Sequence, residues 1–307
     1  MIYTIVLYFM PTVLIVVVTY NGQQHISSCL SPLKGMPENM KCVVIDNDST
    51  DGTPHRIKSD YQFVELIETG KNLGFGAANN IGLRKAINEG YDYVYLLNQD
   101  AWIEKDDIWA LVQIAERNPE YGIISPLQVY ADNKKIDNNF SHNLSKEMKD
   151  DFFLSGNTQK ELYLTIGVGL QAAHWLLRVS TILKAGVFSP SFFHYGEDTN
   201  LCRRAEFHGI KLGITPQILG VHNRENRLKS PSLKFYMAVN NWVQIVSDPK
   251  LPLKSILNLL IKDLFNTFLD YPVKFTPAFL KFIVKIPGIW HNRKVSMHER
   301  AAFLIET

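Results

Sequence analysis

Several kinds of sequence feature are scarce in this chain of 307 residues, and each absence narrows the classes of protein to consider. The net charge is only +2, too small by itself to indicate a nucleic-acid-binding protein. The three cysteines, Cys29, Cys42 and Cys202, lack metal-site spacing, and their odd number favours a reduced, intracellular compartment. Internal repeats and low-complexity tracts are also absent. With 46% hydrophobic and 20% charged residues, the chain is globular rather than disordered.

The first 18 residues of the chain are almost wholly apolar, as in a signal peptide or a membrane span. No basic residues precede this run, no small-residue cleavage site ends it, and Pro11 divides it. The β-branched segment Val13–Val18 therefore predicts a buried strand of a parallel sheet. Residues 1–11 form a hydrophobic lead that packs on the body or touches a membrane, and the sequence leaves both alternatives open.

Strand-like and helix-like patterns then alternate along the first half of the chain. The predicted strands are Val13–Val18, Cys42–Ile45, Phe63–Glu68 and Tyr93–Leu97. The predicted helices are Gln23–Leu33, Thr53–Ser59, Gly76–Glu89 and Asp106–Asn118. Such alternation implies an α/β fold with a mostly parallel central sheet flanked by helices. Further on, residues 125–156 are expected to form loops or an irregular hairpin, and helices are predicted at Val179–Ala185, Asn200–His208 and Ser232–Val246.

The last part of the chain differs in charge. Residues 250–307 carry nine Lys/Arg and four Asp/Glu, a net +5, which leaves −3 on the other 249 residues. Apolar residues in Leu253–Phe268 fall on one helical stripe, and Thr276-Pro277 starts a second amphipathic stretch with interspersed lysines. Neither stretch holds an apolar run of spanning length. Two alternatives stay open: a helical pair packed on the body, or an interfacial anchor on an anionic membrane.

Polar side chains gather where the predicted strands end. The first strand ends at Thr19-Tyr20-Asn21, the second at Asp46-Asn47 and the fourth at Asn98-Gln99-Asp100, while Gly74-Phe75-Gly76 follows the third. Each segment alone is typical of a turn. Together they meet at the carboxyl edge of a parallel sheet, where α/β proteins bind ligands. The sequence predicts a polar cleft there, with amides for phosphate, carboxylates for a metal or ribose, and aromatic stacking surfaces.

Two further elements lie downstream. Glu197 and Asp198 follow an aromatic run and precede a predicted helix, so they either stabilise its N-terminus or supply a general base. His222 follows the strand-like segment Gln217–Leu219. A lone histidine is usually structural, but one close to Asp100 could be a metal ligand. The basic turn after it, with Arg224, could then meet a diphosphate.

In this order, the motifs resemble glycosyltransferase family 2, inverting enzymes with the GT-A fold, and are most similar to its rhamnosyltransferase-like members. The matching segments are T-Y-N at 19–21, D-N-x-S-x-D-G at 46–52, N-x-G-F-G-x-x-N at 72–79, N-x-D at 98–100 and F-F-x-Y-G-E-D at 192–198. The resemblance spans roughly residues 12–240. It implies a GT-A domain at residues 12–228 and a basic, amphipathic helical extension at residues 229–307.

The resemblance also implies a role for each matching position. The residues expected to bind the nucleotide sugar are Thr19, Tyr20, Asn21, Asp46, Asn47, Gly74, Phe75, Asn79, Asn98 and Gln99. Asp100, with His222 completing the shell, would hold Mg²⁺ or Mn²⁺ at the donor's diphosphate. Asp198 would deprotonate the acceptor hydroxyl, with Glu197 beside it. Trp175, His194 and Tyr195 would lie on the acceptor side.

The implied activity is the transfer of a sugar, with inversion, from a nucleotide-diphosphate donor such as dTDP-rhamnose or a UDP-sugar. The implied acceptor is a saccharide or lipid-linked glycan of cell-surface polysaccharide or glycolipid synthesis, in the cytoplasm or peripherally on the inner face of the plasma membrane. No nucleic-acid partner is expected, and the oligomeric state stays open. The alternatives are a nucleotidyltransferase, disfavoured by the lack of Lys or Arg in Gly22-Gln23-Gln24, or a non-catalytic nucleotide-sugar-binding protein.

The chain departs from the family pattern at three positions. Asn98 stands where the family usually has an acid, as in many relatives, which leaves Asp100 as the main metal carboxylate. Asn200 stands where the family often has a second acid after Glu197-Asp198, and Val239 replaces an arginine in the segment Phe235–Asn240. The last change puts any charge contact from that helix in doubt, while Tyr236 and Asn240 remain.

Overall fold

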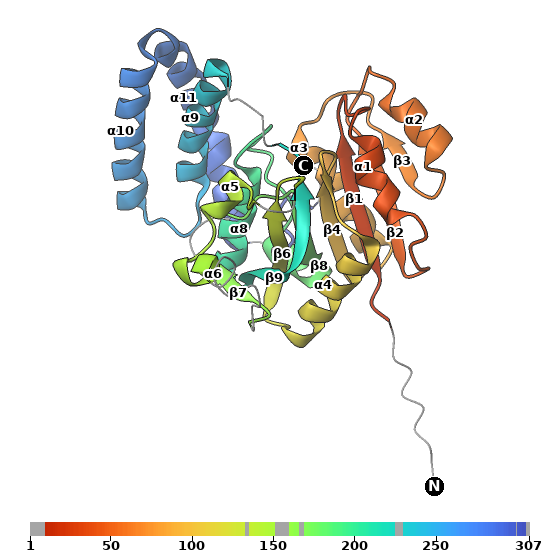
Figure 1. Ribbon diagram of the computed structural model, residues 1–307. Helices are drawn as coiled ribbons and strands as arrows, with labels where there is room; N and C mark the ends of the chain where they lie inside the picture. The colour runs from red at the N-terminus through yellow and green to blue at the C-terminus, as the bar shows by residue number, and fades with distance from the viewer. Residues whose placement is uncertain are drawn as a thin grey trace.

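The computed structural model describes residues 10–132, 135–150, 160–165, 169–224, 230–298 and 300–304. In this part of the chain, a nine-stranded sheet carries helices on both faces, and three C-terminal helices stand beside it (Figure 1). The strand order is β3-β2-β1-β4-β8-β6-β9-β5, with β7 paired to β9. Residues 1–9 of the hydrophobic lead, and the predicted domain boundary between residues 228 and 229, lie outside the described residues.

The first half of the sheet is parallel, as predicted. Its strands are β1 (Val13–Thr19), β2 (Met40–Asp46), β3 (Glu65–Glu68) and β4 (Tyr93–Asn98). Thr19 lies opposite Asp46, and Val18 lies opposite Asn98. Three of the polar strand ends therefore meet at one edge of the sheet.

The helices between these strands follow the predicted pattern with one difference. They are α2 (Thr53–Asp60), α3 (Phe75–Asn88) and α4 (Lys105–Arg117). The single helix expected at Gln23–Leu33 is instead α1 (Ile26–Leu30) followed by the 3-10 turn η1 (Ser31–Leu33). Pro32 explains the change, because it has no N–H to donate and its ring clashes with the carbonyl four residues earlier.

The second half of the sheet is mixed. Strand β8 (His174–Arg178) runs antiparallel between β4 and β6 (Tyr121–Val129), and β9 (Lys211–His222) is parallel to β6. The short strands β5 (Ala101–Trp102) and β7 (Tyr163–Thr165) pair antiparallel with β9.

The expectation of loops or an irregular hairpin from residue 125 was wrong for the first five of those residues. They belong to β6, which continues across Pro126 with a register shift before Leu127. A proline is tolerated at such an irregularity, although it hides the strand in the sequence. Beyond it, Val129 bridges to Ile136, and the short helices α5 (Asn138–Ser141) and α6 (Lys146–Asp150) follow.

Both faces of the sheet are covered. Val16 packs into a cluster with α3, α7 (Val179–Ala185) and α8 (Glu197–Phe207), whereas its neighbour Val17 packs with α1 and α4. Successive residues of a strand point to opposite faces, so burial on both sides explains the unbroken β-branched run of β1.

The C-terminal helices form their own small core around Trp242. They are α9 (Pro231–Ser247), α10 (Leu253–Asp270) and α11 (Pro272–His298). The Trp242 ring lies edge-on to Phe275 and Phe282 of α11. The predicted start at Thr276-Pro277 was wrong, because α11 begins at Pro272 and continues through Pro277. Among the described helices, none combines the length and the apolar character needed to cross a bilayer.

Candidate active site

A cavity of about 400 Å³ opens at the carboxyl ends of β1, β2 and β4. Six of the residues expected to bind the nucleotide sugar line it: Tyr20, Asn47, Gly74, Phe75, Asn98 and Gln99. Asp100 and His194 line it as well. The wall thus combines a carboxylate, amides and aromatic rings, the mixture of apolar surface and few polar groups that small-molecule sites use.

Side-chain amides join the turns around this cavity. Gln99 accepts a hydrogen bond from the backbone N–H of Tyr20 at 2.9 Å and donates to the Tyr20 carbonyl at 3.2 Å. Asn47 accepts from the N–H of Leu73 at 2.8 Å and donates to Asn72 Oδ1 at 3.0 Å. The first two bonds join the turn after β1 to the turn after β4, and the other two join the turn after β2 to the glycine segment.

Gly74 brings a distant segment into the cavity wall. Its φ of +83° lies in the region that only glycine adopts readily. A Cβ at this position would lie 2.2 Å from the Phe193 carbonyl oxygen, which accepts a hydrogen bond from the N–H of Phe75 at 3.1 Å. The aromatic run before Glu197 therefore contacts the glycine segment directly, and no side chain fits between them.

Four of the expected nucleotide-binding residues are not among those lining the cavity. Asp46 is buried, and its two oxygens accept from Thr19 Oγ1 at 3.0 Å and from the Ser49 N–H at 2.9 Å. Asn21 accepts from the Thr50 N–H at 2.8 Å, and buried Asn79 donates to the Phe75 carbonyl at 3.0 Å. In this structure these side chains stabilise the turns, and their direct contact with a nucleotide stays a prediction.

The structure brings Asp100 and His222 together. Ala101 of β5 pairs with His222 of β9, and the Asn223 N–H donates to the Asp100 carbonyl at 2.8 Å. His222 Nε2 lies 3.4 Å from Asp100 Oδ1. The expected proximity of these two residues is therefore present, and it results from one short antiparallel pairing.

A third acid, Asp137, lies behind His222 and was missed by the sequence reasoning. Its Oδ2 lies 3.8 Å from His222 Nδ1, and both its oxygens accept hydrogen bonds from Arg224, at 2.6 and 3.0 Å. Burial opposes the charged form, but the bonds from Arg224 hold the pKa of Asp137 below its usual value. Asp137 lay in a stretch with no periodic pattern, and Arg224 pairs with it rather than projecting freely toward a diphosphate.

Asp100 and His222 form a pair of side chains that could both bind one divalent cation. Their two facing atoms are 3.4 Å apart, close enough to bind the same ion. Mg²⁺ is commonly held by one or two protein ligands together with substrate phosphates and water. Within the described ranges, no group of three His, Cys, Asp or Glu residues is arranged to hold a metal alone. Phosphate oxygens or water could occupy the remaining coordination positions.

The acids Glu197 and Asp198 open α8 after Gly196, whose φ is +96°. Burial, with the adjacent charge of Asp198, raises the pKa of Glu197 to about 8. Glu197 Oε2 is a buried oxygen without a hydrogen-bond partner. Burial also raises the pKa of Asp198, opposed by a 2.7 Å hydrogen bond from the Thr199 N–H. Burial raises the pKa of both carboxyls, and because they are adjacent, ionisation of both at once is disfavoured.

The raised pKa of Glu197 predicts a pH-dependent stability. The carboxyl ionises near 4.5 in the unfolded chain but only near 8 in the native state. Between these values the native state binds more protons, so the stability contributed by the neutral carboxyl is complete below 4.5, declines as pH rises and is lost above 8. Relative to Glu197→Gln, the wild-type free energy of unfolding should fall by roughly 1 kcal/mol per pH unit across this window.

Chemical denaturation of both proteins at several pH values measures this difference. Glu38→Gln, at an exposed carboxyl, serves as the control and should follow the wild type. Parallel pH profiles for the wild type and Glu197→Gln would show that Glu197 is not held neutral by burial.

The three residues expected on the acceptor side have different positions. His194 is exposed and lines the cavity, and its ring centroid lies 4.0 Å from that of Tyr195. Asn240 of α9 donates to the carbonyls of both, at 2.7 and 3.1 Å. Trp175 is fully buried in β8 and stacks on Phe188. It supports the wall from inside the core and does not reach a cavity surface.

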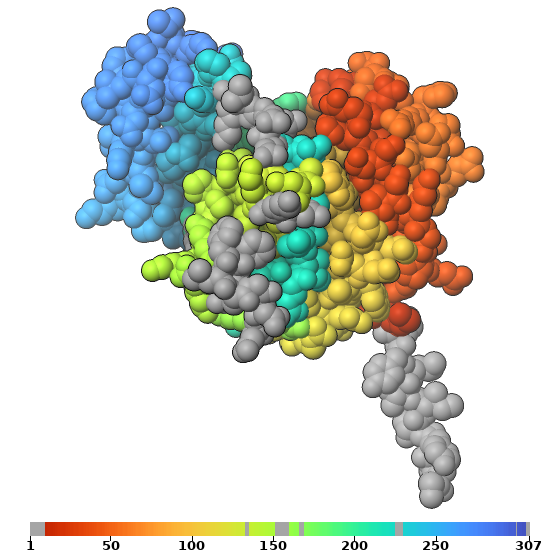
Figure 2. All heavy atoms as spheres, viewed as in Figure 1, coloured from red at the N-terminus to blue at the C-terminus, as the bar shows by residue number. Residues whose placement is uncertain are grey.

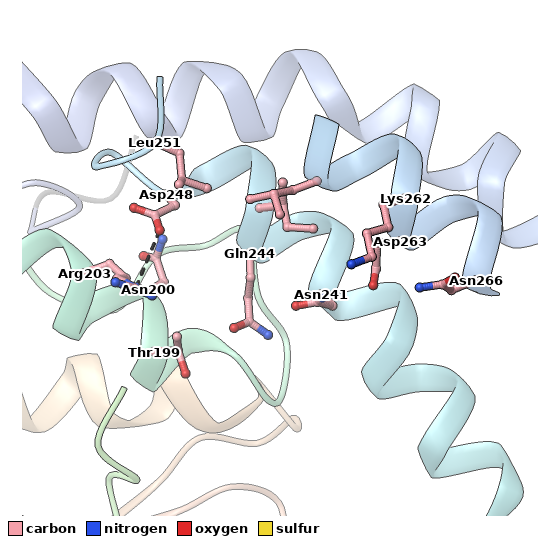
Figure 3. A pocket seen from close by; sticks show the side chains of 12 residues that line it. Thr199, Asn200, Arg203, Asn241, Gln244, Asp248, Leu251, Lys262, Asp263 and Asn266 are labelled. Atoms are coloured by element: carbon pink, nitrogen blue, oxygen red, sulfur yellow. Dashed lines mark ion pairs between the residues drawn. The ribbon is translucent and has the colours of Figure 1, made fainter. Parts of the chain in front are cut away.

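A second cavity of about 400 Å³ lies between α8, α9 and α10 (Figure 3). Its lining is rich in amides and charges: Asn241, Gln244, Asn266, Asp263 and Lys262, with an Arg203–Asp248 ion pair of 3.5 Å at one side. Thr199 also lines it, and Thr199 Oγ1 lies 3.5 Å from Asp198 Oδ1. This cavity therefore approaches the acid pair from the side of the C-terminal helices.

The acid pair packs against α3 on one side and approaches the second cavity on the other. A Cβ placed on Gly76 of α3 would lie 3.6 Å from Glu197 Cβ. Thr199 connects Asp198 to the amide-rich cavity. Neither acid is among the residues that line the first or the second cavity.

Asn200 and Asn80 hold this arrangement in place. Asn200, which replaces the family's second acid, donates to Ser247 of α9 at 3.1 Å and accepts from Arg204 at 3.0 Å. Asn80 of α3, which the sequence reasoning missed, exchanges two 2.9 Å hydrogen bonds with the backbone of Phe188. Neither residue carries a sequence signal beyond its polarity.

Comparison with known proteins agrees with this geometry. The family model described as glycosyl transferase family 2 matches residues 14–175. A low-salt glycan biosynthesis hexosyltransferase of Haloferax volcanii is 27% identical over 236 residues, which are 74% of this chain and 73% of that protein. The rhamnosyltransferase WbbL of Escherichia coli is 28% identical over 231 residues, 70% of this chain and 85% of that protein.

A solved structure shows the same fold. The mannosyltransferase PcManGT from Pyrobaculum calidifontis, in complex with GDP-Man and Mn²⁺, has a TM-score of 0.56 at 15% identity, covering 97% of this chain and 89% of that one. The fold is therefore of the GT-A type, as expected. Because the family model covers more than half of the sequence and the ordered strand-end motifs meet at one site, the chain belongs to glycosyl transferase family 2, as a rhamnosyltransferase-like glycosyltransferase.

Proposed function

We propose that the protein is an inverting glycosyltransferase in which Asp198 is the general base. Two adjacent carboxyls with raised pKa values, connected to the second cavity through Thr199, carry this proposal. A single displacement needs a base at the acceptor hydroxyl and a stabilised leaving group on the opposite side of the reacting carbon. Asp198 would remove the acceptor proton, and neutral Glu197 would leave the negative charge on its neighbour.

The donor would bind in the first cavity, with its diphosphate toward Asp100. The two relatives are named as a hexosyltransferase and a rhamnosyltransferase, so nucleotide-activated hexoses and rhamnose are the first donors to test, beginning with dTDP-rhamnose and UDP-sugars. Asp100 and His222 would hold Mg²⁺ or Mn²⁺, and the Mn²⁺ complex of the mannosyltransferase supports such use. When bound, the cation would supply a Lewis acid that neutralises charge on the leaving diphosphate. The amide-bonded turns at Gln99 and Asn47 would orient the nucleotide.

The acceptor would approach from the second cavity. Amide and carboxylate side chains suit sugar hydroxyls, which both donate and accept hydrogen bonds. A saccharide or lipid-linked glycan of cell-surface polysaccharide or glycolipid synthesis is therefore the proposed acceptor, met on the cytoplasmic side, at the inner face of the plasma membrane.

The test is acceptor-dependent release of nucleoside diphosphate from a panel of nucleotide sugars, with analysis of the anomeric configuration of the product. Transfer with inversion supports the proposal. Release of pyrophosphate from a nucleoside triphosphate would instead identify a nucleotidyltransferase. Donor binding without hydrolysis or transfer, with every acceptor and cation, would identify a binding protein.

In the same assay, Asn241→Ala should raise the acceptor KM by about two- to tenfold, the effect of losing one hydrogen bond. The donor KM should not change, because Asn241 lies in the second cavity only. Asn88→Ala, at an exposed amide at the end of α3, is the matched control. A raised donor KM with an unchanged acceptor KM would contradict the assignment of the two cavities.

A further inference from the structure

Exposed apolar side chains are concentrated on the two last helices. Of the nineteen large hydrophobic side chains that are exposed in the described part of the chain, eleven lie on α10 and α11. Helix α10 lies at the outer edge of the molecule (Figures 1 and 2), whereas α11 packs beside α9 and its C-terminal part reaches the end of α8. A concentration of this kind marks a surface that binds another molecule or a membrane.

On α10, five of the seven exposed large hydrophobic side chains form one stripe. They recur every fourth residue and are between 50% and 65% exposed: Leu253, Leu257, Ile261, Phe265 and Leu269. Residues four apart stack on one side of a helix, so the stripe is continuous. The inner side of the same helix, with Ile256 and Thr267, is buried. Helix α10 therefore packs on the molecule through its other side, and no element among the described residues covers the stripe.

On α11 three kinds of side chain occupy three sides. Phe282 and Ile289 are buried inward. Val273, Leu280 and Val284 are 89%, 58% and 79% exposed. Each of these three is followed directly by an exposed lysine: Lys274, Lys281 and Lys285. Successive residues of a helix are rotated by about 100° around its axis, so the three lysines form a row along the border of the exposed apolar row.

The positive charge of this surface indicates an anionic partner. Together α10 and α11 contain seven Lys/Arg and two Asp, and α11 contains no acidic residue. An apolar stripe bordered by lysines fits a bilayer with anionic headgroups, because the chains bury the apolar side chains and the lysines reach the headgroups. A second copy of the protein would oppose one lysine row with another, which is unfavourable.

We infer that the exposed faces of α10 and α11 dock the protein peripherally on an anionic membrane surface. The surface is formed by Leu253, Leu257, Ile261, Phe265, Leu269, Val273, Leu280 and Val284, with Lys274, Lys281 and Lys285 at its border. The inference deepens the proposed function, since a membrane-bound enzyme meets lipid-linked acceptors. Docking itself needs neither catalysis nor a bound donor.

Flotation of the full chain with vesicles tests the inference. The protein should bind vesicles that contain phosphatidylglycerol, bind pure phosphatidylcholine vesicles much less, and be released by salt. The triple variant Ile261→Ser/Phe265→Ser/Leu269→Ser should bind anionic vesicles at least about tenfold more weakly. Lys274→Gln/Lys281→Gln/Lys285→Gln should lose the preference for anionic lipid.

A matched control removes exposed apolar side chains from other faces. Leu164→Ser/Leu183→Ser changes residues that are 43% and 44% exposed on β7 and α7, and should bind like the wild type. Unchanged thermal unfolding and unchanged acceptor-independent donor hydrolysis would show that the variants stay folded.

Two results would overturn the inference. One is full vesicle binding by the triple serine variant, which would place the membrane contact elsewhere in the chain. The other is a wild-type dimer that the triple variant dissociates, with no binding to anionic vesicles, which would assign the surface to a second copy. Because vesicle binding is measured without substrates, its failure leaves the proposed transferase activity to its own assay.

Discussion

Replacing Asp198 by asparagine is expected to lower kcat for sugar transfer by about 10²–10⁴-fold, the contribution typical of a general base. Asparagine has nearly the same shape as aspartate but cannot accept the proton of the acceptor hydroxyl. The hydrogen bond from the Thr199 N–H to Oδ1 can persist in the variant. The dissociation constant of the donor should therefore stay unchanged, because Asp198 is not among the residues lining the donor cavity.

A control separates base chemistry from an effect on the helix. Acids in the first turn also interact favourably with the helix dipole, so Asp198→Asn could act through α8 stability. Asp106 stands in the first turn of α4 and is 91% exposed, so Asp106→Asn removes an equivalent charge away from the site. It should leave kcat unchanged. Steady-state assays of sugar transfer measure kcat, and isothermal titration calorimetry measures the dissociation constant of the donor. A wild-type kcat in Asp198→Asn would refute the assignment of Asp198 as the base.

The second large effect is expected from Asp100→Ala. The substitution removes the only carboxylate of the proposed cation pair, leaving His222 as the remaining ligand. Transfer should fall at least about 10²-fold, since a cation at a leaving diphosphate supplies several kcal/mol of stabilisation. The thermal shift that a nucleoside diphosphate produces in the presence of Mn²⁺ should disappear as well.

Chelation provides the matching experiment on the unchanged protein. EDTA should abolish transfer by the wild type, and added Mg²⁺ or Mn²⁺ should restore it. Asp106→Asn again serves as the charge control and should keep the cation-dependent thermal shift. Robust transfer in EDTA, or an unchanged shift in Asp100→Ala, would contradict the proposed cation site.

The positions of the strand-end motifs could be derived from the sequence because their cause is local. The alternation of β-branched runs with helical segments implies parallel strands, and parallel strands place their carboxyl ends at one edge. The register of Thr19 with Asp46 and of Val18 with Asn98 agrees with this. The order of five short motifs indicated the family, which the family model then confirmed.

Local sequence patterns were misleading where contacts with distant residues outweigh local conformational preferences. Pro277 is typical of a helix start, yet α11 runs through it, because Phe275 and Phe282 on either side both pack on Trp242. Trp175 belongs to a segment that resembles the family's acceptor-side stretch, and the structure buries it in β8, in the middle of the sheet, so its acceptor role stays a prediction. A single sequence shows that a residue is apolar, and the neighbours of its strand decide whether it is reachable.

The sequence by itself determined the fold class and the shared edge of the polar turns, because periodicity and motif order are properties of neighbouring residues. Only the tertiary structure decided that Asp100 meets His222, that Asp137 and Arg224 stand behind them, and that Thr199 connects Asp198 to the second cavity. These contacts join segments far apart in the chain through strand pairing and helix packing. The stability of these contacts depends on packing throughout the core, so it cannot be derived from any short stretch of sequence.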